Sequence, residues 1–512
     1  MTKFSCRFAV GGDPNLNQTS AHGGLVLWLE LLRRTGVLHD LPVSVAGRQG
    51  WTDGQMMLAV ALLNVVGYEH VSDVDALEED ASLCRLVRDY EEAMLGLPAA
   101  ELARRFRGGR GRTFPSANAV HDWLRRFQDE AAGQPRKKGT AVVPKPAAEL
   151  QAVAAVTRRL AHRLVQVLGL DELTLDMDAT VLASGKRDAL YTYRSATGKA
   201  PGERGYQPLT VFCPELGMVL ASEFRDGNVP AKVRNLELLE QGLAELPPEI
   251  KRVGLRADGA GFQQKLIRFC NEPASRPEAL RRFGVIGFVC SADLDDGMRK
   301  SLSRTPAQWW GPVPGSELEC ADLDHVSTWG ARPAQAGQLL RHVATRCALS
   351  GELGLGEDES PATDGAPAYR HRVYLTNHPY PIAPHEGAGP AMETADLVRY
   401  AHERCGHGEE VHAVLKQDLA GGLMPSGKFG PNAAWWQLAV LSANLNAVLR
   451  HCAFGRDWLW VRMKQVRRHW VHLVARVTRH ARVQRLLFQP SRVSRVHRAL
   501  GRMTRTLAHA PP

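Results

Sequence analysis

Hydrophobic and polar positions follow two different periods along this chain, and the change between them divides the sequence. Over residues 20–128 the apolar positions recur every three or four residues, which predicts several helices. Thr52-Asp53-Gly54-Gln55 has the composition of a capping box ahead of the apolar run MMLAVALLNVV. Ser116 precedes a further amphipathic helix. We therefore predict a helical N-terminal domain over residues 1–132.

The pattern changes to period two after a basic, proline-punctuated linker at residues 133–146 and one more helix. In LTLDMDATVL, one strand face is apolar and the other carries Asp176 and Asp178. QPLTVF and MVLASEF flank the turn CPELG as a hairpin, and a helix, the strand RVGLRA, another helix and the strand FGVIGFVC follow. This order predicts an α/β fold with a mixed sheet covered by helices. A right-handed crossover would place the strand that ends at Asp258 parallel to the strand of Asp178.

This sheet domain is predicted to extend over residues 147–455 and to contain a β-rich insertion at about 291–394. The insertion has short strand candidates (QWWGPV, HVSTW, HRVYLT) and an acidic loop rich in glycine and proline. Its aromatic residues Trp309, Trp310 and Trp329 are interpreted first as the core of a small β-domain and alternatively as a platform for a flipped DNA base. From Thr394 the chain is predicted to be helical again.

The positive charge lies at the C-terminal end. The whole chain carries +10 with a pI near 9.2, yet residues 456–512 hold 14 Lys and Arg against one acid, so that the remainder carries −3. Apolar residues from Leu459 to Val477 recur in steps of three and four and predict one helix, which Pro490 should end or kink. We predict a basic helical tail that either docks on the core or contacts DNA phosphates, and the scarcity of acids favours the phosphates.

The remaining composition narrows the class of protein. Hydrophobic residues make up 44% and charged residues 23% of the chain, which excludes wholesale disorder. The N-terminal residues lack an apolar signal segment, and no uncharged run approaches the roughly 18 residues of a membrane helix. Nine cysteines without a C-x-x-C pair indicate reduced thiols. We predict a cytoplasmic protein without a membrane segment.

Three aspartates are the candidate catalytic groups. Aspartate is disfavoured in strands and is rarely buried without a partner, so Asp176, Asp178 and Asp258 each need one. Carboxylates about 4 Å apart repel by roughly 4 kcal/mol per pair at an effective dielectric near 20, so a cluster takes up protons or binds a cation. Oxygen ligands favour Mg²⁺ or Mn²⁺. For any one of these residues alone, an ion pair with arginine or a turn cap is the alternative.

A long motif follows Tyr400: YAHERCGHGEEVHAVLKQDLAGGLMPSGKFGPNAAWWQLAVLSANL. It predicts a helix from about Gly408 that brings Glu409, His412 and Lys416 together, then a glycine-rich loop and a second helix. With LDMDATVL, GYQPLTVF and LRADGAGF, it resembles the Asp-Asp-Glu (DDE) transposases of bacterial insertion sequences, in the subgroup called transposase DDE domain group 1. The likeness covers most of residues 20–450.

The resemblance implies a ribonuclease-H-like catalytic core and a helical domain that binds the terminal inverted repeats of a mobile element. In the family, the first catalytic Asp precedes a small or hydroxyl residue and then Thr or Ser, which selects Asp178 over Asp176. Asp258 matches the second Asp.

The third acid of the family lies in a Tyr-x2-Arg-x3-Glu-x6-Lys signature. Glu409 and Lys416 have the signature's spacing, whereas Tyr400 and Arg404 depart from it, and Glu410 stays an alternative to Glu409.

The implied activity is metal-dependent phosphodiester cleavage followed by strand transfer. Asp178, Asp258 and Glu409 would bind two Mg²⁺ or Mn²⁺ ions, while Tyr400, Arg404 and Lys416 would lie against DNA beside the scissile bond. Further phosphate contacts are expected from the outward-facing arginines of the N-terminal domain and the tail, which are Arg125, Arg126, Arg467 and Arg468.

The expected partners are double-stranded DNA, as terminal repeats and as target, and a second copy of the chain when two ends are paired. No ATP site is expected, because GGRGRT lacks a P-loop context. The expected location is the bacterial cytoplasm, at the nucleoid. The alternatives are a ribonuclease-H-like nuclease that cuts without joining and a non-catalytic DNA-binding protein derived from a transposase.

Overall fold

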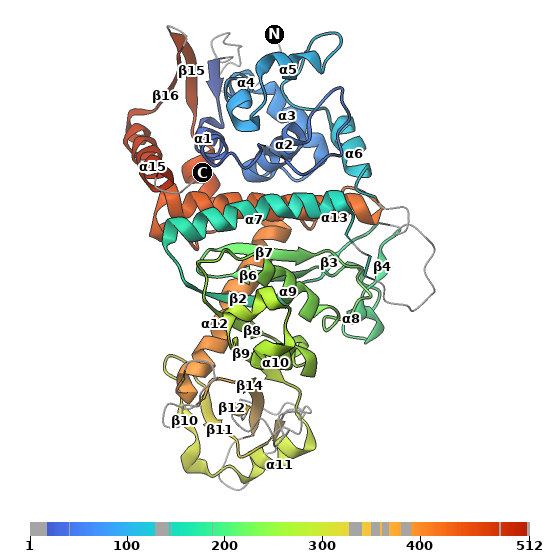
Figure 1. Cartoon of the computed structure of the whole chain (residues 1–512), viewed down its shortest axis with the longest axis vertical. Helices are drawn as coiled ribbons and strands as arrows, with labels where there is room; N and C mark the ends of the chain where they lie inside the picture. Colours follow the sequence, from blue (N-terminus) through green and yellow to red (C-terminus); the bar gives the residue numbers. More distant parts are fainter. Residues whose placement is uncertain are drawn as a thin grey trace, which may run out of the picture.

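The chain forms a mixed α/β structure in three tiers along its long axis. The computed structural model describes residues 18–39, 41–128, 143–144, 146–186, 188–326, 340–349, 359–360, 368–379, 391–480 and 483–508. Figure 1 shows helices at one end, a central sheet crossed by two long helices, and a β-rich region at the other end.

The predicted N-terminal helices are present. Thr52 caps the second of them: its Oγ1 accepts from Gln55 N at 3.1 Å, and Gln55 Oε1 accepts from Thr52 N at 2.9 Å. Ser116 Oγ accepts from Ala119 N at 3.3 Å. The helices are α1 (Val26–Thr35), α2 (Asp53–Val66), α3 (Val74–Glu79), α4 (Ala81–Leu95), α5 (Ala99–Arg104) and α6 (Ala117–Arg125).

The C-terminal segment differs from the single helix that the sequence predicted. A short helix and a π-helical turn are followed by a hairpin and a second helix: α14 (Met463–Val466), Arg467–Val471, β15 (Ala475–His480), β16 (Val483–Phe488) and α15 (Pro490–Ala508). Ala475 and Val477 are buried while Val474 and Arg476 are exposed, so the local period is two. Pro490 begins a helix instead of ending one, because a helix's first turn does not need the missing N–H.

This segment is docked on the N-terminal region. Strand β15 pairs antiparallel with β1 (Thr19–Ser20), which joins the two ends of the chain in one three-stranded sheet. The Trp470 ring stacks on Phe454 with centroids 4.2 Å apart, and Met463 and Val466 are fully buried. The docked interpretation of the apolar stripe is therefore confirmed for residues 463–471.

A ten-stranded mixed sheet forms the middle and lower tiers. Its order is β10-β11-β12-β14-β9-β8-β2-β6-β7, and β13 pairs with β14. Strands β2, β6 and β7 are antiparallel, whereas β2, β8 and β9 are parallel. The predicted parallel pairing of the Asp178 and Asp258 strands is confirmed. The strands are β2 (Glu172–Ala179), β6 (Leu209–Cys213), β7 (Met218–Glu223), β8 (Arg252–Ala257), β9 (Gly287–Ala292), β10 (Gly311–Pro312), β11 (Glu319–Asp322), β12 (Arg341–Ala348), β13 (Glu359–Ser360) and β14 (Tyr369–Thr376).

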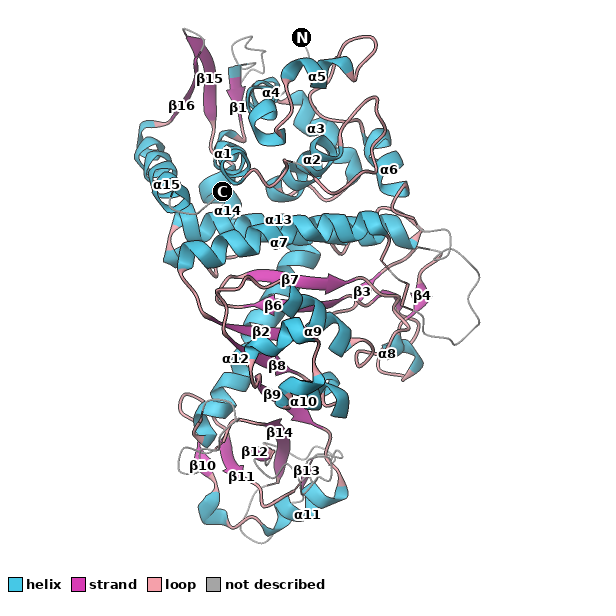
Figure 2. Cartoon of the chain, viewed as in Figure 1, coloured by secondary structure: helices cyan, strands magenta, loops and turns pink. Residues whose placement is uncertain are grey.

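Helices cover both faces and one edge of this sheet (Figure 2). Val211 of β6 faces α9 (Asn235–Ala244), where it lies near Gly242. The next residue back, Thr210, faces the other side and meets α12 (Thr394–Ala413). Helices α7 (Ala148–Leu168) and α13 (Phe429–Leu449) pack on each other and on β7, and α13 also contacts α2 and α6.

The predicted insertion continues the central sheet. Strand β14 pairs antiparallel with β9, and β12 and β11 follow outward. Strands β11 and β12 were not predicted from the sequence. Trp310 is buried beneath the Arg346 guanidinium, 4.4 Å from its ring centroid, as a core role predicts, whereas Trp309 is 57% exposed. Trp329 and most of the predicted linker lie outside the described residues.

A small third sheet follows β2 directly and was not predicted. It consists of β3 (Leu182–Ala183), β5 (Arg204–Tyr206) and β4 (Leu190–Tyr191), with the short helix α8 (Tyr193–Ala196) between β4 and β5. Tyr206 anchors it: the ring packs against Phe224, and the hydroxyl accepts from Asn432 at 3.0 Å.

Among the described residues, no individual helix combines the length and apolar composition needed to cross a membrane. One sharply bent pair, Asp53–Val66 with Val71–Glu79, meets that test jointly.

Candidate active site

Two aspartates lie at neighbouring strand ends in the middle of the sheet. In the parallel β2–β8 ladder the last pair is Met177 with Ala257, and Asp178 and Asp258 are the next residue of each strand. Asp258 Oδ1 accepts from Ala260 N at 2.8 Å in the turn that follows β8. Gly261 is required there, because a Cβ at this position would lie 2.4 Å from the Cβ of Ala257.

The Asp178 carboxylate is only partly compensated. Burial raises its pKa to about 6, the Arg404 guanidinium offsets part of that effect, and the neighbouring charge of Asp258 adds to it. Arg404 Nη1 lies 3.3 Å from Asp178 Oδ2, and the Asp178 side chain is 22% exposed. This carboxylate is therefore suited to hold a proton or to bind a cation.

Asp176, two residues earlier on the same strand face, is fully paired. It accepts from Arg256 Nε at 2.6 Å and from Arg256 Nη2 at 2.8 Å, and both side chains are almost completely buried. Arg256 Nη1 also donates to the Tyr400 carbonyl at 2.9 Å and to Glu403 at 2.8 Å. The alternative predicted for a single aspartate, an ion pair with arginine, is confirmed for Asp176.

One face of helix α12 and its π-helical continuation (Val414–Asp418) lies along these strand ends. The residues that share it are four apart: Arg404, Gly408, His412 and Lys416. A Cβ on Gly408 would lie 4.0 Å from Asp178 Oδ2, His412 Nδ1 lies 3.8 Å from the same oxygen, and Lys416 Nζ donates to Thr180 Oγ1 at 3.1 Å. π-Helical turns occur frequently at functional sites.

His412 belongs to this face as a neutral imidazole. Burial, together with the charges of Lys416 and Arg404, lowers its pKa to about 4. Its Nε2 lies 3.0 Å from Thr210 Oγ1 on β6. From the sequence, His412 had no assigned role and Arg404 was predicted to contact DNA; the four-residue spacing from Arg404 to Lys416 is the signal that could have identified their shared face.

Glu409 does not share the helix face that lies against the aspartates. Its side chain is exposed. Successive residues of an α-helix are rotated by about 100°, so when Gly408 faces Asp178 its neighbour lies to the side. Within the described ranges, no three His, Cys, Asp or Glu side chains are close enough to hold a metal ion. The predicted three-carboxylate cluster is therefore not assembled in this conformation, in which Arg404 approaches Asp178 instead.

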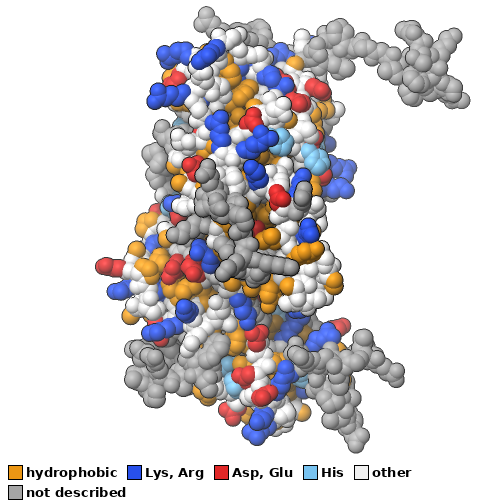
Figure 3. All heavy atoms as spheres, turned by 90° about the vertical axis from the view of Figure 1, so that its right-hand side faces the viewer, with side chains coloured by type: hydrophobic (Ala, Val, Ile, Leu, Met, Phe, Trp, Pro, Cys, Tyr) orange, Lys and Arg blue, Asp and Glu red, His pale blue; other side chains and the backbone are white. Residues whose placement is uncertain are grey.

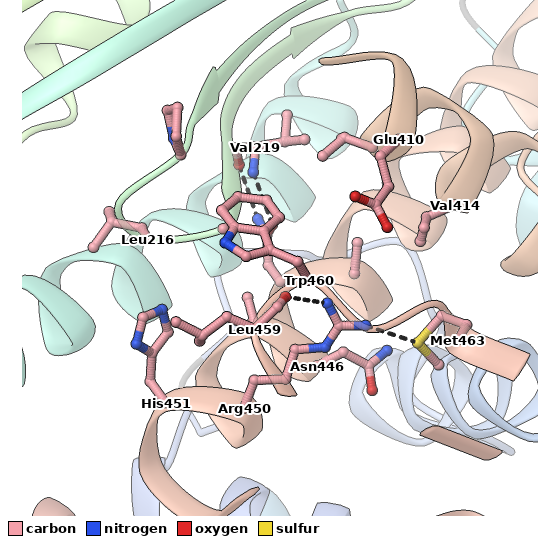
Figure 4. Close-up of a pocket in the computed structure, with 16 residues that line it drawn as sticks. Leu216, Val219, Glu410, Val414, Asn446, Arg450, His451, Leu459, Trp460 and Met463 are labelled. Carbon is pink, nitrogen blue, oxygen red and sulfur yellow. Dashed lines mark hydrogen bonds between the residues drawn. The ribbon is translucent and has the colours of Figure 1, made fainter. Parts of the chain in front are cut away.

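Glu410 points into a separate pocket on the far side of α12 (Figure 4). The pocket has a volume of about 50 Å³ and is lined by Glu410, Arg450, His451, Trp460 and Met463, among others. Arg450 donates to the carbonyls of Leu459 and Val461 at 2.6 Å each. Because Glu410 is rotated by about 200° from Gly408, helix geometry favours Glu409 over Glu410 as the acid that can reach Asp178.

Two of the predicted DNA contacts are engaged inside the protein. The Tyr400 ring lies 5.0 Å from the Arg256 guanidinium, and burial raises the pKa of its hydroxyl to about 12. Arg467 donates to the carbonyls of Asn64 and Val65 at 3.0 Å each, and also to that of Asp418. It thereby satisfies carbonyls in the last turn of α2, which lack partners within that helix.

Three other predicted contacts are exposed on the surface. Arg125 pairs with Asp122 at 2.6 Å, and Arg126 donates to the Val45 carbonyl at 2.8 Å. Arg468 is exposed on the π-helical turn.

The donor chemistry at the strand ends suits a divalent cation. Asp178 and Asp258 offer hard oxygen ligands of the kind that Mg²⁺ and Mn²⁺ prefer. Binding a cation would also relieve the burial and like-charge repulsion that raise the Asp178 pKa. These two residues fit such an ion; a third protein ligand requires a side chain of α12 to turn towards it.

No protein-family model matches this sequence, and no curated protein is significantly similar to it. A solved structure titled as a cryo-EM structure of the piggyBac transposase synaptic complex with hairpin DNA is similar at a TM-score of 0.42 and 11% sequence identity. The similarity covers 81% of this chain and 70% of the other. Because this TM-score lies below 0.5, the similarity by itself establishes neither a shared fold nor a shared function.

Proposed function

We propose that this protein is a DNA transposase of the DDE type, which binds the ends of a mobile element and catalyses phosphodiester cleavage and strand transfer on a ribonuclease-H-like core. The observation that carries the proposal is the position of Asp178 and Asp258 at adjacent parallel strand ends, with a raised Asp178 pKa. Perturbed carboxylates at a strand end are typical of functional sites. The strand order β7-β6-β2-β8-β9 agrees with the proposed core.

Asp178 and Asp258 would hold divalent cations, with Glu409 as the third acid once its exposed side chain turns inward. Cations bound there supply Lewis-acid stabilisation of the phosphoryl oxygens and activate a water or a DNA 3′-hydroxyl. Arg404 would release Asp178 and contact a phosphate, because a guanidinium binds a phosphate bidentately. Lys416, which donates to Thr180 beside the site, would hold a neighbouring phosphate.

His412 has a positioning role in this proposal. It is buried between Asp178 and Thr210 and is neutral at physiological pH, so it adds no positive charge that competes with a cation. Its contacts with β2 and β6 fix the distance between α12 and the strand ends. The partners proposed for the protein are double-stranded DNA and, when two ends are paired, a second copy of the chain.

The test uses a plasmid that carries the gene together with its flanking genomic DNA, purified full-length protein, Mg²⁺ and a separate target plasmid. Wild type should cut at the element's ends and join them to the target. Asp178→Asn and Asp258→Asn should bind the same DNA without cutting it. Wild-type cutting without joined products would instead support a nuclease, and binding without any cutting would support a non-catalytic DNA-binding protein.

The same assay identifies the third acid by comparing two matched variants. Glu409→Gln should abolish cutting, whereas Glu410→Gln, which changes an acid in the pocket beside Arg450, should retain most of it. The reverse result would assign the role to Glu410.

A further inference from the structure

Two exposed tyrosines stand out on the small sheet that follows β2. We call residues 181–206, with β3, β4, β5 and α8, the tyrosine sheet. Tyr191 is 55% exposed and Tyr193 43% exposed, which places two of the eight exposed large hydrophobic side chains of the described chain within three residues. Neither belongs to the apolar cluster that anchors the sheet through Leu182, Ala189 and Tyr206. Their exposure therefore needs an explanation other than packing.

The Tyr191 ring is held in place from one side. The Arg204 guanidinium lies over it, 4.4 Å from the ring centroid, and donates to the Tyr191 hydroxyl at 3.0 Å. Arg204 covers one face, and the residue as a whole is 55% exposed. An aromatic ring fixed in this way binds a flat partner with little further loss of side-chain entropy.

The surroundings of the two rings are positively charged. The described residues of 181–206 contain four Lys and Arg against two acids, a net charge of +2 in a body that is otherwise acidic up to residue 455. Lys186, Arg194 and Lys199 are exposed. Figure 3 looks onto the side where β4 and α8 lie and shows Lys and Arg side chains next to hydrophobic ones.

The tyrosine sheet is tied to the strand ends that carry the aspartates. Strand β3 begins two residues after Thr180, which accepts from Lys416. Tyr193 N donates to Gly227 O at 2.7 Å, so α8 rests on the segment that leads from β7 into α9. At the start of α9, Asn235 Nδ2 donates to Ala260 O at 3.0 Å, in the turn after Asp258. These contacts link the tyrosine sheet to the strand ends that carry Asp178 and Asp258.

We propose that the tyrosine sheet binds unpaired DNA beside the scissile phosphate, with bases stacked on Tyr191 and Tyr193 and with Arg194, Lys186 and Lys199 on the phosphates. This inference rests on the proposed function and adds a contact site to it. An open aromatic face within a basic surface is the combination that binds single strands, because bases stack on the rings while cations follow the backbone. Base pairing in a duplex hides the base faces, so the rings favour frayed or single-stranded DNA.

The experiment measures binding of a fluorescein-labelled 20-nucleotide single strand of mixed sequence, and of the same sequence as a duplex, to full-length protein in EDTA. Tyr191→Ala should weaken single-strand binding about 5- to 20-fold and duplex binding less than about twofold. Tyr191→Phe keeps the ring and should bind like wild type. Arg204→Ala should fall between them, because it frees the ring without removing it.

Trp460→Ala is the control, because it truncates an exposed aromatic residue outside the tyrosine sheet. It should leave both affinities unchanged. Unchanged single-strand binding by Tyr191→Ala, an equal loss in Trp460→Ala, or a loss of self-association in Tyr191→Ala with unchanged DNA affinity would each overturn the inference and leave the proposed function standing. Failure of the wild type to bind either DNA would contradict the proposed function itself.

Discussion

Strand β2 places one aspartate in its middle and another at its C-terminal end, and the two have different partners. Asp176 is buried with two hydrogen bonds from Arg256, which has further partners on α12. Burial raises the pKa of both carboxyls, but Asp178, two residues later on the same face, has only a longer contact with Arg404 and lies beside the charge of Asp258. A complete ion pair serves the stability of the fold, whereas an incompletely compensated carboxylate remains able to take a proton or a cation.

The largest expected effect comes from breaking the complete pair. Arg256→Met leaves the Asp176 charge buried without its partner and should lower the free energy of unfolding by about 3–5 kcal/mol in urea denaturation. Arg252→Met is the control on the same strand, since Arg252 is 61% exposed and pairs with exposed acids. It should change stability far less than Arg256→Met, because solvent screens an exposed ion pair. Equal losses in both variants would remove the distinction between the two regions.

At the end of the strand, removing the charge of Asp178 is expected to raise the free energy of unfolding. The folded-state pKa of Asp178, about 6, lies above the ordinary value of 3.8, so ionisation opposes folding. The penalty is absent below about pH 4, grows between pH 4 and 6, and is complete above. In EDTA at pH 7.5, Asp178→Asn should therefore be more stable than wild type by up to about 3 kcal/mol.

Urea denaturation of both proteins from pH 3.5 to 7.5 measures this difference. The two stabilities should converge at the acid end. A variant that is less stable than wild type at every pH would show that Arg404 pairs with Asp178 as completely as Arg256 pairs with Asp176.

A bound divalent cation should offset the free-energy cost of ionising Asp178 in the folded protein. At 10 to 100 times its dissociation constant, Mg²⁺ should stabilise wild type by about 1–3 kcal/mol, seen as a higher Tm in a thermal melt. Asp178→Asn and Asp258→Asn should lose most of this shift. Glu410→Gln should keep it, because that side chain lies in a different pocket. Equal Mg²⁺ shifts in all four proteins would place the ion elsewhere.

The smallest effect concerns the basic C-terminal segment. Deleting it would expose Met463, Val466 and Trp470, so point changes are the appropriate test. Arg468, Arg498 and Arg505 are exposed, and changing all three to Gln should reduce the salt dependence of duplex binding, by a slope of about 0.9 for each phosphate that no longer has an arginine partner. An unchanged slope would show that these arginines are solvent-exposed and do not contact phosphates.

The pairing of the strands could be predicted from the sequence, but the partners of the individual side chains could not. The order of strands and helices, with a right-handed crossover, was enough to place β8 beside β2 and hence Asp258 beside Asp178. It did not reveal that Gly408 and not Glu409 faces Asp178, because the rotation of α12 depends on its packing over the whole sheet. Arg256 was equally hidden, since its partner Asp176 lies 80 residues away in sequence.

Short elements were missed for a different reason. Strands β3 and β4 have two residues each and show no detectable period. In the C-terminal segment, Val477 fits both a helical stripe and a strand face, and pairing of β15 with β1 from the other end of the chain decides between them. Interactions across more than 450 residues leave no local signal.

The most direct test is the anomalous scattering of Mn²⁺ in crystals of the full-length protein. The account predicts an anomalous peak between the carboxylates of Asp178 and Asp258, with Arg404 displaced from Asp178 and Glu409 turned towards the ion. No peak should appear at Asp176, whose oxygens are occupied by Arg256. A crystal with Mn²⁺ in the medium, an unchanged Arg404–Asp178 contact and no ion at the two strand ends would contradict it.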